Sequence, residues 1–220
     1  MQFSAWEPIY QQIIDDFGFS RRRDEEAGQL LYDLLKGQSS QLSAAMAIVS
    51  GRRAIVCGNA PCLDKELSEW LVLGEPRRKD AAILAADGAT EVLLKLGIVP
   101  DIVVTDLDGP FSAIQEANQK GSILAVHAHG DNLDALSRYV PQLDRIIGTV
   151  QCRPLPGLHN FGGFTDGDRS VFLARELEAS EIDLLGFDFD DNSVTPRKKK
   201  KLAWAKRLVD LALMDARAIG

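Results

Sequence analysis

The chain has 220 residues, enough for one domain of ordinary size with a sizeable core. Its formal net charge of −7 argues against a nucleic-acid partner, which would require an excess of basic residues. No apolar run reaches the roughly 20 residues that span a bilayer, and the N-terminus lacks a secretory signal pattern. The three cysteines include no CxxC pair and suit a reducing compartment. We therefore expect a cytoplasmic protein with no membrane partner.

The first 50 residues show helical periodicity and little strand character. In DEEAGQLLYDLL (24–35), five apolar residues fall at i, i+3, i+4, i+7 and i+8, which is one face of an α-helix: Ala27, Leu30, Leu31, Leu34 and Leu35. Asp24 to Glu26 place negative charge in the first turn of this helix. We predict that residues 1–50 form a small N-terminal helical cap on a main domain spanning 51–220.

From Arg53 onward the pattern changes to six short apolar runs without polar alternation: AIVC (54–57), AAILAA (81–86), DIVVTD (101–106), SILAVHA (122–128), RIIGTV (145–150) and IDLLGF (182–187). Such runs are typical of strands buried on both faces. Helix-like segments separate most of them, at 63–73, 89–97, 110–121, 131–140 and 169–179. This alternation favours right-handed crossovers and a mainly parallel sheet. We therefore predict an α/β fold with a Rossmann-like sheet flanked by helices.

Two later segments depart from the alternation. Residues 151–168 are rich in glycine and proline and indicate a long functional loop. The segment 197–216 predicts a closing helix with a basic start. Its lysines at 198–201 could reach a phosphate, but such a charge run is usually a solvated face, which is the interpretation we favour.

Ligands of an open parallel sheet bind beyond the carboxyl ends of its strands. Acids or glycines follow nearly every run at that edge: Gly58, Asn59, Ala60 and Pro61; Asp87 and Gly88; Asp106 and Asp108; His129, Gly130, Asp131 and Asn132; Gly162, Gly163, Thr165, Asp166, Gly167 and Arg169; and Asp188. Together they indicate one site far better than any of them does alone.

Asp106 and Asp108, in PDIVVTDLDGP (100–110), are the strongest candidates for a metal site. Two adjacent carboxylates repel each other, and together they attract a hard cation with oxygen ligands, best magnesium carried in on phosphates. A structural turn explains one aspartate but not two beside Asp87, although Asp87 alone would also serve as the cap of a helix at 89–96.

Two glycine-containing segments suit phosphates. The Gly58–Pro61 turn can present backbone N–H groups at a helix N-terminus, although it is neither GxGxxG nor a P-loop and Asn59 could simply cap the helix. In GGFTDGDR (162–169), the glycines allow close backbone approach, and Arg169 suits a phosphate better than it suits the helix dipole. A flexible loop before a capped helix is the alternative.

The HAHGDN segment (127–132) carries two histidines. His127 lies within the strand pattern and is expected to pack or hydrogen-bond locally, whereas His129 lies at the strand end, where a substrate could approach. Asp131 could cap the next helix. No third histidine has metal-ligand spacing, which argues against zinc or iron.

A haloacid-dehalogenase-type phosphatase also presents Asp-x-Asp-Gly after a strand. In that superfamily the motif normally follows the first strand, whereas at least two strand–helix units precede Asp106 here. Pro110 stands where that family usually has Thr or Val, and no convincing lysine precedes the acidic pair that DFDD (188–191) would supply. The phosphatase is the weaker interpretation.

An ordered set of segments between residues 15 and 190 resembles the archaeal 6-hydroxymethyl-7,8-dihydropterin pyrophosphokinases, the MptE-like family: DFGFS, GNAPCL, AADGAT, PDIVVTDLDG, HAHGDN, GFTDGDR and LLGFDF. Residues 85–109 also resemble the thiamine pyrophosphokinase signature, but Ala89-Thr90 after Asp87-Gly88, and Thr105 and Gly109 around the acid pair, depart from it. The same domain occurs in bacterial motility-associated proteins linked to flagellin glycosylation.

The resemblance implies transfer of diphosphate from ATP to the primary hydroxyl of a dihydropterin, releasing AMP, in a pathway to methanopterin or folate. It implies that Asp87, Asp106 and Asp108 bind Mg²⁺ and are catalytic, that the 58–61 and 162–169 segments hold ATP, and that the second substrate contacts the following residues: His129, Gly130, Asp131, Asn132 and Asp188. One of the aspartates could accept the hydroxyl proton.

Related enzymes are often dimers, so a homodimer is expected by analogy. The alternatives to the pterin enzyme are a thiamine diphosphokinase, a phosphatase, and a nucleotide-binding or glycan-transfer module related by fold.

Overall fold

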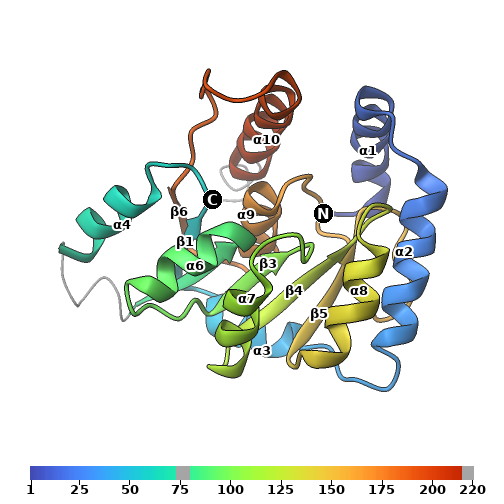
Figure 1. The fold of residues 1–220 in the computed structure, drawn as a ribbon, viewed down its shortest axis with the longest axis horizontal. Helices are drawn as coiled ribbons and strands as arrows, with labels where there is room; N and C mark the ends of the chain where they lie inside the picture. Colours follow the sequence, from blue (N-terminus) through green and yellow to red (C-terminus); the bar gives the residue numbers. More distant parts are fainter. Residues whose placement is uncertain (73–79, 215–220) are drawn as a thin grey trace.

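The structure is a computed structural model that describes residues 1–72 and 80–214 (Figure 1). Six strands form one all-parallel sheet in the order β5-β4-β3-β2-β1-β6. Their bounds are β1 Arg53–Cys57, β2 Ala81–Ala86, β3 Ile102–Thr105, β4 Ile123–Ala128, β5 Ile146–Val150 and β6 Glu181–Leu185. Each strand lies within two residues of its predicted run, which confirms the α/β fold.

Helices follow most of the strands, as predicted. They are α4 Leu63–Val72, α6 Asp87–Lys95, α7 Phe111–Gln119, α8 Leu133–Tyr139, continued by a 3₁₀ turn at Val140–Gln142, and α9 Asp166–Glu176. Residue 73, the last of the helical segment predicted after β1, lies outside the described residues.

The two faces of β1 and β2 pack into different hydrophobic clusters. Ile55 and Cys57 of β1 pack with Leu63 and Leu67 of α4, whereas the alternate residues of this strand, such as Val56, belong to the cluster that includes α9. Because successive strand residues point to opposite faces, burial on both sides explains why these strands show no polar alternation.

The chain reverses its direction of travel across the sheet once. Strands β1 to β5 are added outward in sequence order, and the chain then returns to place β6 on the other side of β1. Helix α9 makes this return and packs against β1, β2, β3 and β6. Its N-terminus consequently lies near the carboxyl ends of the central strands, where ligands of such sheets bind.

The first 50 residues, all of which the structure describes, contain three helices and no strand: α1 Phe3–Phe17, α2 Arg21–Leu34 and α3 Leu42–Val49. Helix α2 packs against β4, β5 and α8. Trp6, Tyr10 and Leu31 are almost fully buried in the same hydrophobic cluster as the sheet. The N-terminal helices therefore share the core of the main domain.

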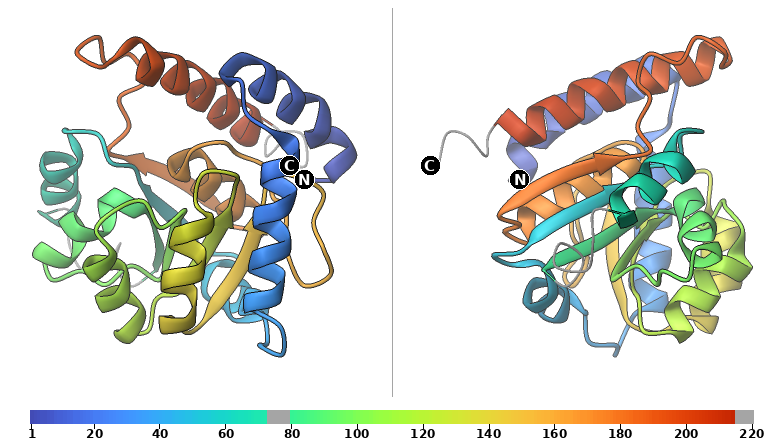
Figure 2. Two further views of the ribbon diagram at one scale, coloured as in Figure 1. Left: turned by 45° about the vertical axis from the view of Figure 1, so that its right-hand side comes forward. Right: turned by 90° about the vertical axis from the view of Figure 1, so that its left-hand side faces the viewer.

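The last described helix, α10 (Pro196–Met214), packs on α9 and runs beside α1 (Figure 2). The indole Nε1 of Trp204 donates to Asp16 Oδ2 at 2.7 Å, and Lys200 Nζ donates to the backbone oxygen of the same residue at 2.6 Å. The predicted end of this helix at residue 216 falls beyond the described part. Among the described residues, no helix combines the length and apolar character needed to cross a membrane.

Candidate active site

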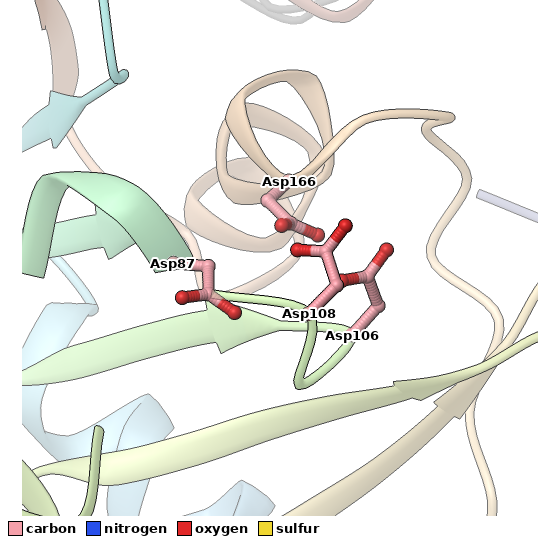
Figure 3. A group of neighbouring side chains, drawn as sticks. All are labelled: Asp87, Asp106, Asp108 and Asp166. Atoms are coloured by element: carbon pink, nitrogen blue, oxygen red, sulfur yellow. The ribbon is translucent and has the colours of Figure 1, made fainter. Parts of the chain in front are cut away.

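Four aspartates meet at the carboxyl edge of the sheet (Figure 3). Asp87 begins α6, Asp106 and Asp108 follow β3, and Asp166 begins α9. Each offers a carboxylate oxygen, and these oxygens all lie within 4.8 Å of one another. The structure thus brings together the three aspartates expected to bind a metal. It adds Asp166, which the sequence placed among the nucleotide-binding residues.

Asp87 is held by the neighbouring strand end. Its Oδ2 accepts hydrogen bonds from Thr105 Oγ1 and from the backbone N–H of Gly109, the latter at 3.3 Å. A Cβ on Gly109 would lie 1.9 Å from Asp87 Oδ1, so only glycine allows this contact. The N-cap of α6 is Ala86. The interpretation of Asp87 as a simple helix cap is therefore wrong.

The turn that carries Asp106 and Asp108 has an unusual backbone. Leu107 between them adopts φ 65°, a left-handed conformation that is rare for a bulky residue. Its side chain is buried and its N–H donates to Thr105 Oγ1 at 2.8 Å. Burial of Leu107 holds the strained turn in place, and both flanking carboxylates reach the cluster.

Burial and mutual repulsion shift the pKa values of the cluster. Burial raises the pKa of Asp87 and, with the negative charge of Asp106, that of Asp166. The same two causes raise the pKa of Asp108 to about 6. Burial opposes ionisation of Asp106 as well, but the His129 hydrogen bond and the charge of Arg169 hold its pKa below the usual range.

Two carboxylate oxygens of the cluster remain unsatisfied. Asp87 Oδ1 and Asp106 Oδ1 are buried and have no hydrogen-bond partner among the described residues. Buried polar atoms without partners are costly, and clustered carboxylate oxygens are the ligands of hard divalent cations. These four residues fit a metal ion, and the acidic group could hold one.

The N-terminus of α9 lies against the cluster. Thr165 is its N-cap and forms a capping box with Asp168, so the helix begins three residues before the segment predicted from Arg169. Arg169, 7% exposed, donates from Nη1 to Asp166 Oδ1 at 3.2 Å. The capped helix of the alternative interpretation is present, with Arg169 inside the site.

A cavity of about 610 Å³ opens above the cluster. Its walls include every predicted nucleotide-binding residue except the two loop glycines: Gly58, Asn59, Ala60, Pro61, Thr165, Asp166, Gly167 and Arg169. Gly163 lies directly beneath Arg169, since its Cβ would be 2.7 Å from the Arg169 Cα. Gly162 instead contacts the ring of Phe172.

Helix α10 closes one side of this cavity with Lys198, Lys201, Leu202 and Ala205. These positions are spaced i, i+3, i+4 and i+7 and so share one helix face. Lys201 is only partly exposed on this wall, and Lys198 lines the cavity while remaining exposed, so the lysine run is not a solvated face throughout. Their spacing was a signal, but the sequence could not show which face of α10 meets the sheet.

A second cavity of about 230 Å³ adjoins the first and is lined by His129, Gly130 and Asp131. His129 Nε2 lies 3.2 Å from Asp106 Oδ2. The remaining predicted substrate contacts lie elsewhere. Asp188 is on the wall of the larger cavity, and Asn132 is buried beneath the loop.

The amide of Asn132 donates to the backbone oxygens of Asp106 and His127, at 2.7 and 2.8 Å. Asn132 is also the residue at the N-cap of α8, so the interpretation of Asp131 as the cap is wrong. His127 is buried, with Nδ1 3.0 Å from Thr149 Oγ1, which confirms its local packing role.

Asp24 is a buried residue of the site region that sequence reasoning missed. It is 3% exposed, and its carboxylate accepts from Tyr10 Oη, Gln151 Nε2 and the N–H of Gly130, at 2.6, 2.8 and 2.8 Å. The sequence suggested only a favourable charge in the first turn of α2. Two of its partners lie more than 100 residues away, so no local pattern could reveal this role.

The fold and site define a class: a Rossmann-like α/β protein with an acidic cleft that could hold a cation at the carboxyl edge of its sheet, next to a helix N-terminus and lysines, as in phosphoryl-transfer enzymes. The model of the family described as 6-hydroxymethylpterin diphosphokinase MptE-like matches residues 29–193. The chain belongs to this family, and the resemblance inferred from its motifs is confirmed.

Three relatives are each named 6-hydroxymethyl-7,8-dihydropterin pyrophosphokinase. The protein of Methanothermobacter thermautotrophicus is 44% identical, over 96% of this chain and 94% of that protein. The protein of Pyrococcus furiosus is 38% identical, over 99% of this chain and 97% of that protein. The protein of Methanocaldococcus jannaschii is 36% identical, over 96% of this chain and 95% of that protein.

A solved structure, the MAf glycosyltransferase from Magnetospirillum magneticum AMB-1, matches with a TM-score of 0.53 and 16% identity. The match covers 81% of this chain and 29% of that one, and at this identity it supports the fold alone.

Proposed function

We propose that the protein transfers diphosphate from ATP to the hydroxymethyl group of 6-hydroxymethyl-7,8-dihydropterin, giving AMP and the pterin diphosphate, in the biosynthesis of methanopterin or folate. Family membership and relatives at 36–44% identity over nearly the whole chain support this activity. The observation that carries it is the cluster of four aspartates, with unsatisfied buried oxygens, which lines the larger cavity and, through Asp106, also the smaller one.

The larger cavity would hold ATP. The N–H of Asn59 in the Gly58–Pro61 turn and the N–H groups of the first turn of α9 would meet its phosphates, because helix N-termini favour anions. The other N–H groups of the 58–61 turn already donate to the backbone oxygens of Leu185 and Gly186. Lys198 and Lys201 face the same space from α10 and would place positive charge against the phosphates. These contacts act by positioning and charge stabilisation, which is most of what phosphoryl transfer requires.

Asp87, Asp106, Asp108 and Asp166 would hold Mg²⁺, which when bound neutralises charge on the polyphosphate. The acceptor oxygen would attack the β-phosphorus in line. The bond from this phosphorus to the oxygen shared with the α-phosphate breaks, and AMP leaves with that oxygen. The hydroxyl proton passes to a carboxylate oxygen of the cluster.

This proposal includes three further expectations from the sequence. Residues 1–50 act as a helical cap whose buried side chains complete the core of the catalytic domain that spans 51–220. The protein works in the cytoplasm, where ATP and pterin precursors are available. It forms a homodimer by analogy with related enzymes.

Product analysis tests the activity. The protein is incubated with ATP, Mg²⁺ and 6-hydroxymethyl-7,8-dihydropterin, with thiamine as a parallel acceptor, and products are separated by chromatography. AMP and the pterin diphosphate are expected with the pterin alone. Formation of ADP would indicate an ordinary kinase, and inorganic phosphate without a diphosphorylated product would indicate a phosphatase. AMP that forms only with thiamine would indicate a thiamine diphosphokinase. Each of these results would contradict the proposal.

The metal-site assignment is tested by Asp106→Ala and Asp108→Ala. Turnover should fall by about 100-fold or more in each, while far-ultraviolet circular dichroism remains unchanged. Asp134→Ala is the control, because Asp134 is an exposed residue in the first turn of α8. Substantial activity in both cluster variants would overturn the assignment.

A further inference from the structure

The smaller cavity is separated from the larger one by a shared wall. Asp106, Phe164, Arg169 and Lys201 line both cavities. The volume of about 610 Å³ falls in the roughly 300–1,000 Å³ range of ligand pockets and has room for a nucleoside triphosphate. About 230 Å³ is too small for that ligand but has room for a single bicyclic ring. A ring held there would have one end at the acidic cluster.

Aromatic side chains form part of the lining of the smaller cavity. Phe19, in the linker between α1 and α2, faces Phe164 with ring centroids 6.2 Å apart. Phe17 stacks behind Phe19 at 5.5 Å, and the Arg197 guanidinium lies 5.6 Å from the Phe19 ring centroid. Aromatic rings and guanidinium planes are the surfaces on which flat heteroaromatic rings stack.

Another part of the lining is polar. Asp24 and Gln151 lie there with the His129–Asp131 loop. A carboxylate has about four acceptor positions, and three of those on Asp24 are used by Tyr10, Gln151 and Gly130. One position is left for a donor, and Asp24 is almost fully buried, so a ligand N–H there would be strongly favoured.

His129 connects this cavity to the cluster. It lines the cavity, and its Nε2 lies 3.2 Å from Asp106 Oδ2. The Gly130 N–H bonds to Asp24, and the Gly130 oxygen accepts from Arg23 Nε at 3.0 Å. A Cβ on Gly130 would lie 2.6 Å from the Arg23 Cβ. The loop is therefore fixed between the N-terminal helices and the catalytic aspartates.

We propose that the smaller cavity is the acceptor site. It would take a flat bicyclic ring bearing an amino-pyrimidinone edge, with Phe19 stacking on the ring, Asp24 accepting from the amino edge, and the hydroxymethyl group directed at the wall shared with the ATP cavity. The inference rests on the proposed function, and it makes Phe19 a specificity-determining residue contributed by the N-terminal region.

The test uses Phe19→Ala and Phe19→Leu in the full-length protein. Phe3→Ala is the matched control, because Phe3 is also partly buried in the N-terminal region and carries an arginine, Arg153, 5.2 Å above its ring, but lines neither cavity. Binding of 6-hydroxymethylpterin is titrated by its fluorescence without ATP. KM values for ATP and for the dihydropterin are measured in parallel.

Phe19→Ala should raise the Kd of the pterin and the KM of the dihydropterin by about tenfold or more, with the KM for ATP changed by less than about twofold. Phe19→Leu keeps the apolar volume without the flat face and should show an intermediate loss; it also stands in if Phe19→Ala fails to fold. Phe3→Ala should bind pterin like the wild type.

The outcomes separate this proposal from the proposed function. If both Phe19 variants bind pterin and turn over as the wild type does, the acceptor site is refuted and the proposed activity stands. If the wild type shows no turnover, the proposed activity is refuted. In that case, pterin binding by the wild type that is lost in the Phe19 variants would still support the acceptor site. If the wild type does not bind pterin either, both proposals are refuted. A rise in the KM for ATP alone would assign the cavity to the nucleotide.

Discussion

Asp87, Asp106, Asp108 and Asp166 place their carboxylates in one small volume, with oxygens within 4.8 Å of one another. Like charges at this distance raise the free energy of the folded state, and burial adds to the effect. A bound divalent cation would offset both the repulsion between the carboxylates and the cost of burying their charge. The site is therefore expected to lower the stability of the metal-free protein, as functional sites often do.

The first prediction concerns Asp108→Asn. The folded state raises the pKa of Asp108 from 3.8 to about 6, so its ionised form disfavours folding. The corresponding loss of stability develops as pH rises from about 3.8 to about 6 and persists above it. In EDTA at pH 7.5 the variant should melt at a higher temperature than the wild type, and at pH 4 the difference should shrink.

Thermal unfolding followed by circular dichroism between pH 4 and 8 measures this difference. Saturating Mg²⁺ should stabilise the wild type more than the variant, because the variant has lost a ligand. Asp134→Asn controls for the general effect of removing a surface carboxylate. A variant that melts below the wild type in EDTA at pH 7.5 would show that repulsion does not dominate at this position.

The second prediction compares two lysines of one run, Lys199 and Lys201. Lys201 lines both cavities, whereas Lys199 is exposed and donates to Asn192 Oδ1 at 2.7 Å. Lys201→Ala should lower kcat/KM for ATP by about 100-fold, because it removes a cation positioned at the polyphosphate. Lys199→Ala should stay within about twofold. Steady-state kinetics measures kcat/KM for both variants, and equal losses would show that the effect comes from net charge and not from the position of Lys201.

At the scale of the elements, the sequence is a good guide to the sheet and a poor one to the turns. Strands β1 to β5 were predictable because burial on both faces leaves a continuous apolar run, whereas β6, at the edge of the sheet, is apolar in sequence but only partly buried. The conformation of Leu107 was not, because its burial and the Thr105 hydrogen bond come from tertiary packing. The start of α9 had a local signal, since Thr165 and Asp168 have the spacing of a capping box.

The third prediction concerns the loop that leads into α9. Gly163 and Gly157 both adopt positive φ, 93° and 86°. A Cβ on Gly163 would lie 2.7 Å from the Arg169 Cα, whereas nothing lies within 4 Å of a Cβ on Gly157. Gly157→Ala should therefore cost only the backbone strain, about 1–2 kcal/mol. Gly163→Ala should cost more and also displace the first turn of α9.

Urea unfolding and steady-state kinetics separate the two effects. We expect Gly157→Ala to retain wild-type turnover at temperatures where it is folded, and Gly163→Ala to lose most of its turnover even when folded, because Asp166 and Arg169 move with the helix start. Normal kinetics in a folded Gly163→Ala protein would show that the helix start tolerates the shift.

At the scale of the whole molecule, the site depends on segments from both ends of the chain. Helix α10 brings Lys198 and Lys201 to the larger cavity, and the N-terminal region brings Phe19 and Asp24 to the smaller one. Helices α1 and α10 also contact each other through Asp16 and Trp204. The sequence located the acids at the sheet edge, but only the tertiary fold brings these distant segments to them.

The last prediction follows from this arrangement and concerns a chain that begins at residue 51. Trp6, Tyr10, Ile13 and Leu31 are almost fully buried in the main hydrophobic cluster, and Trp6 Nε1 donates to the backbone oxygen of Gln151 at 2.9 Å. Their removal would expose apolar surface on the sheet, and each Å² exposed lowers the free energy of unfolding by about 25 cal/mol. The fragment should lose cooperative unfolding and bind dyes that report exposed apolar surface.

The milder variant Tyr10→Phe separates folding from function. It removes the hydroxyl that donates to Asp24 Oδ2 at 2.6 Å but keeps the ring in the core, so the protein should fold with a loss of about 1–3 kcal/mol. Because the Asp24 carboxylate also holds the Gly130 N–H, pterin binding should weaken while ATP binding is retained. A 51–220 fragment that unfolds cooperatively and binds both substrates like the full chain would instead show that the first 50 residues are a dispensable cap.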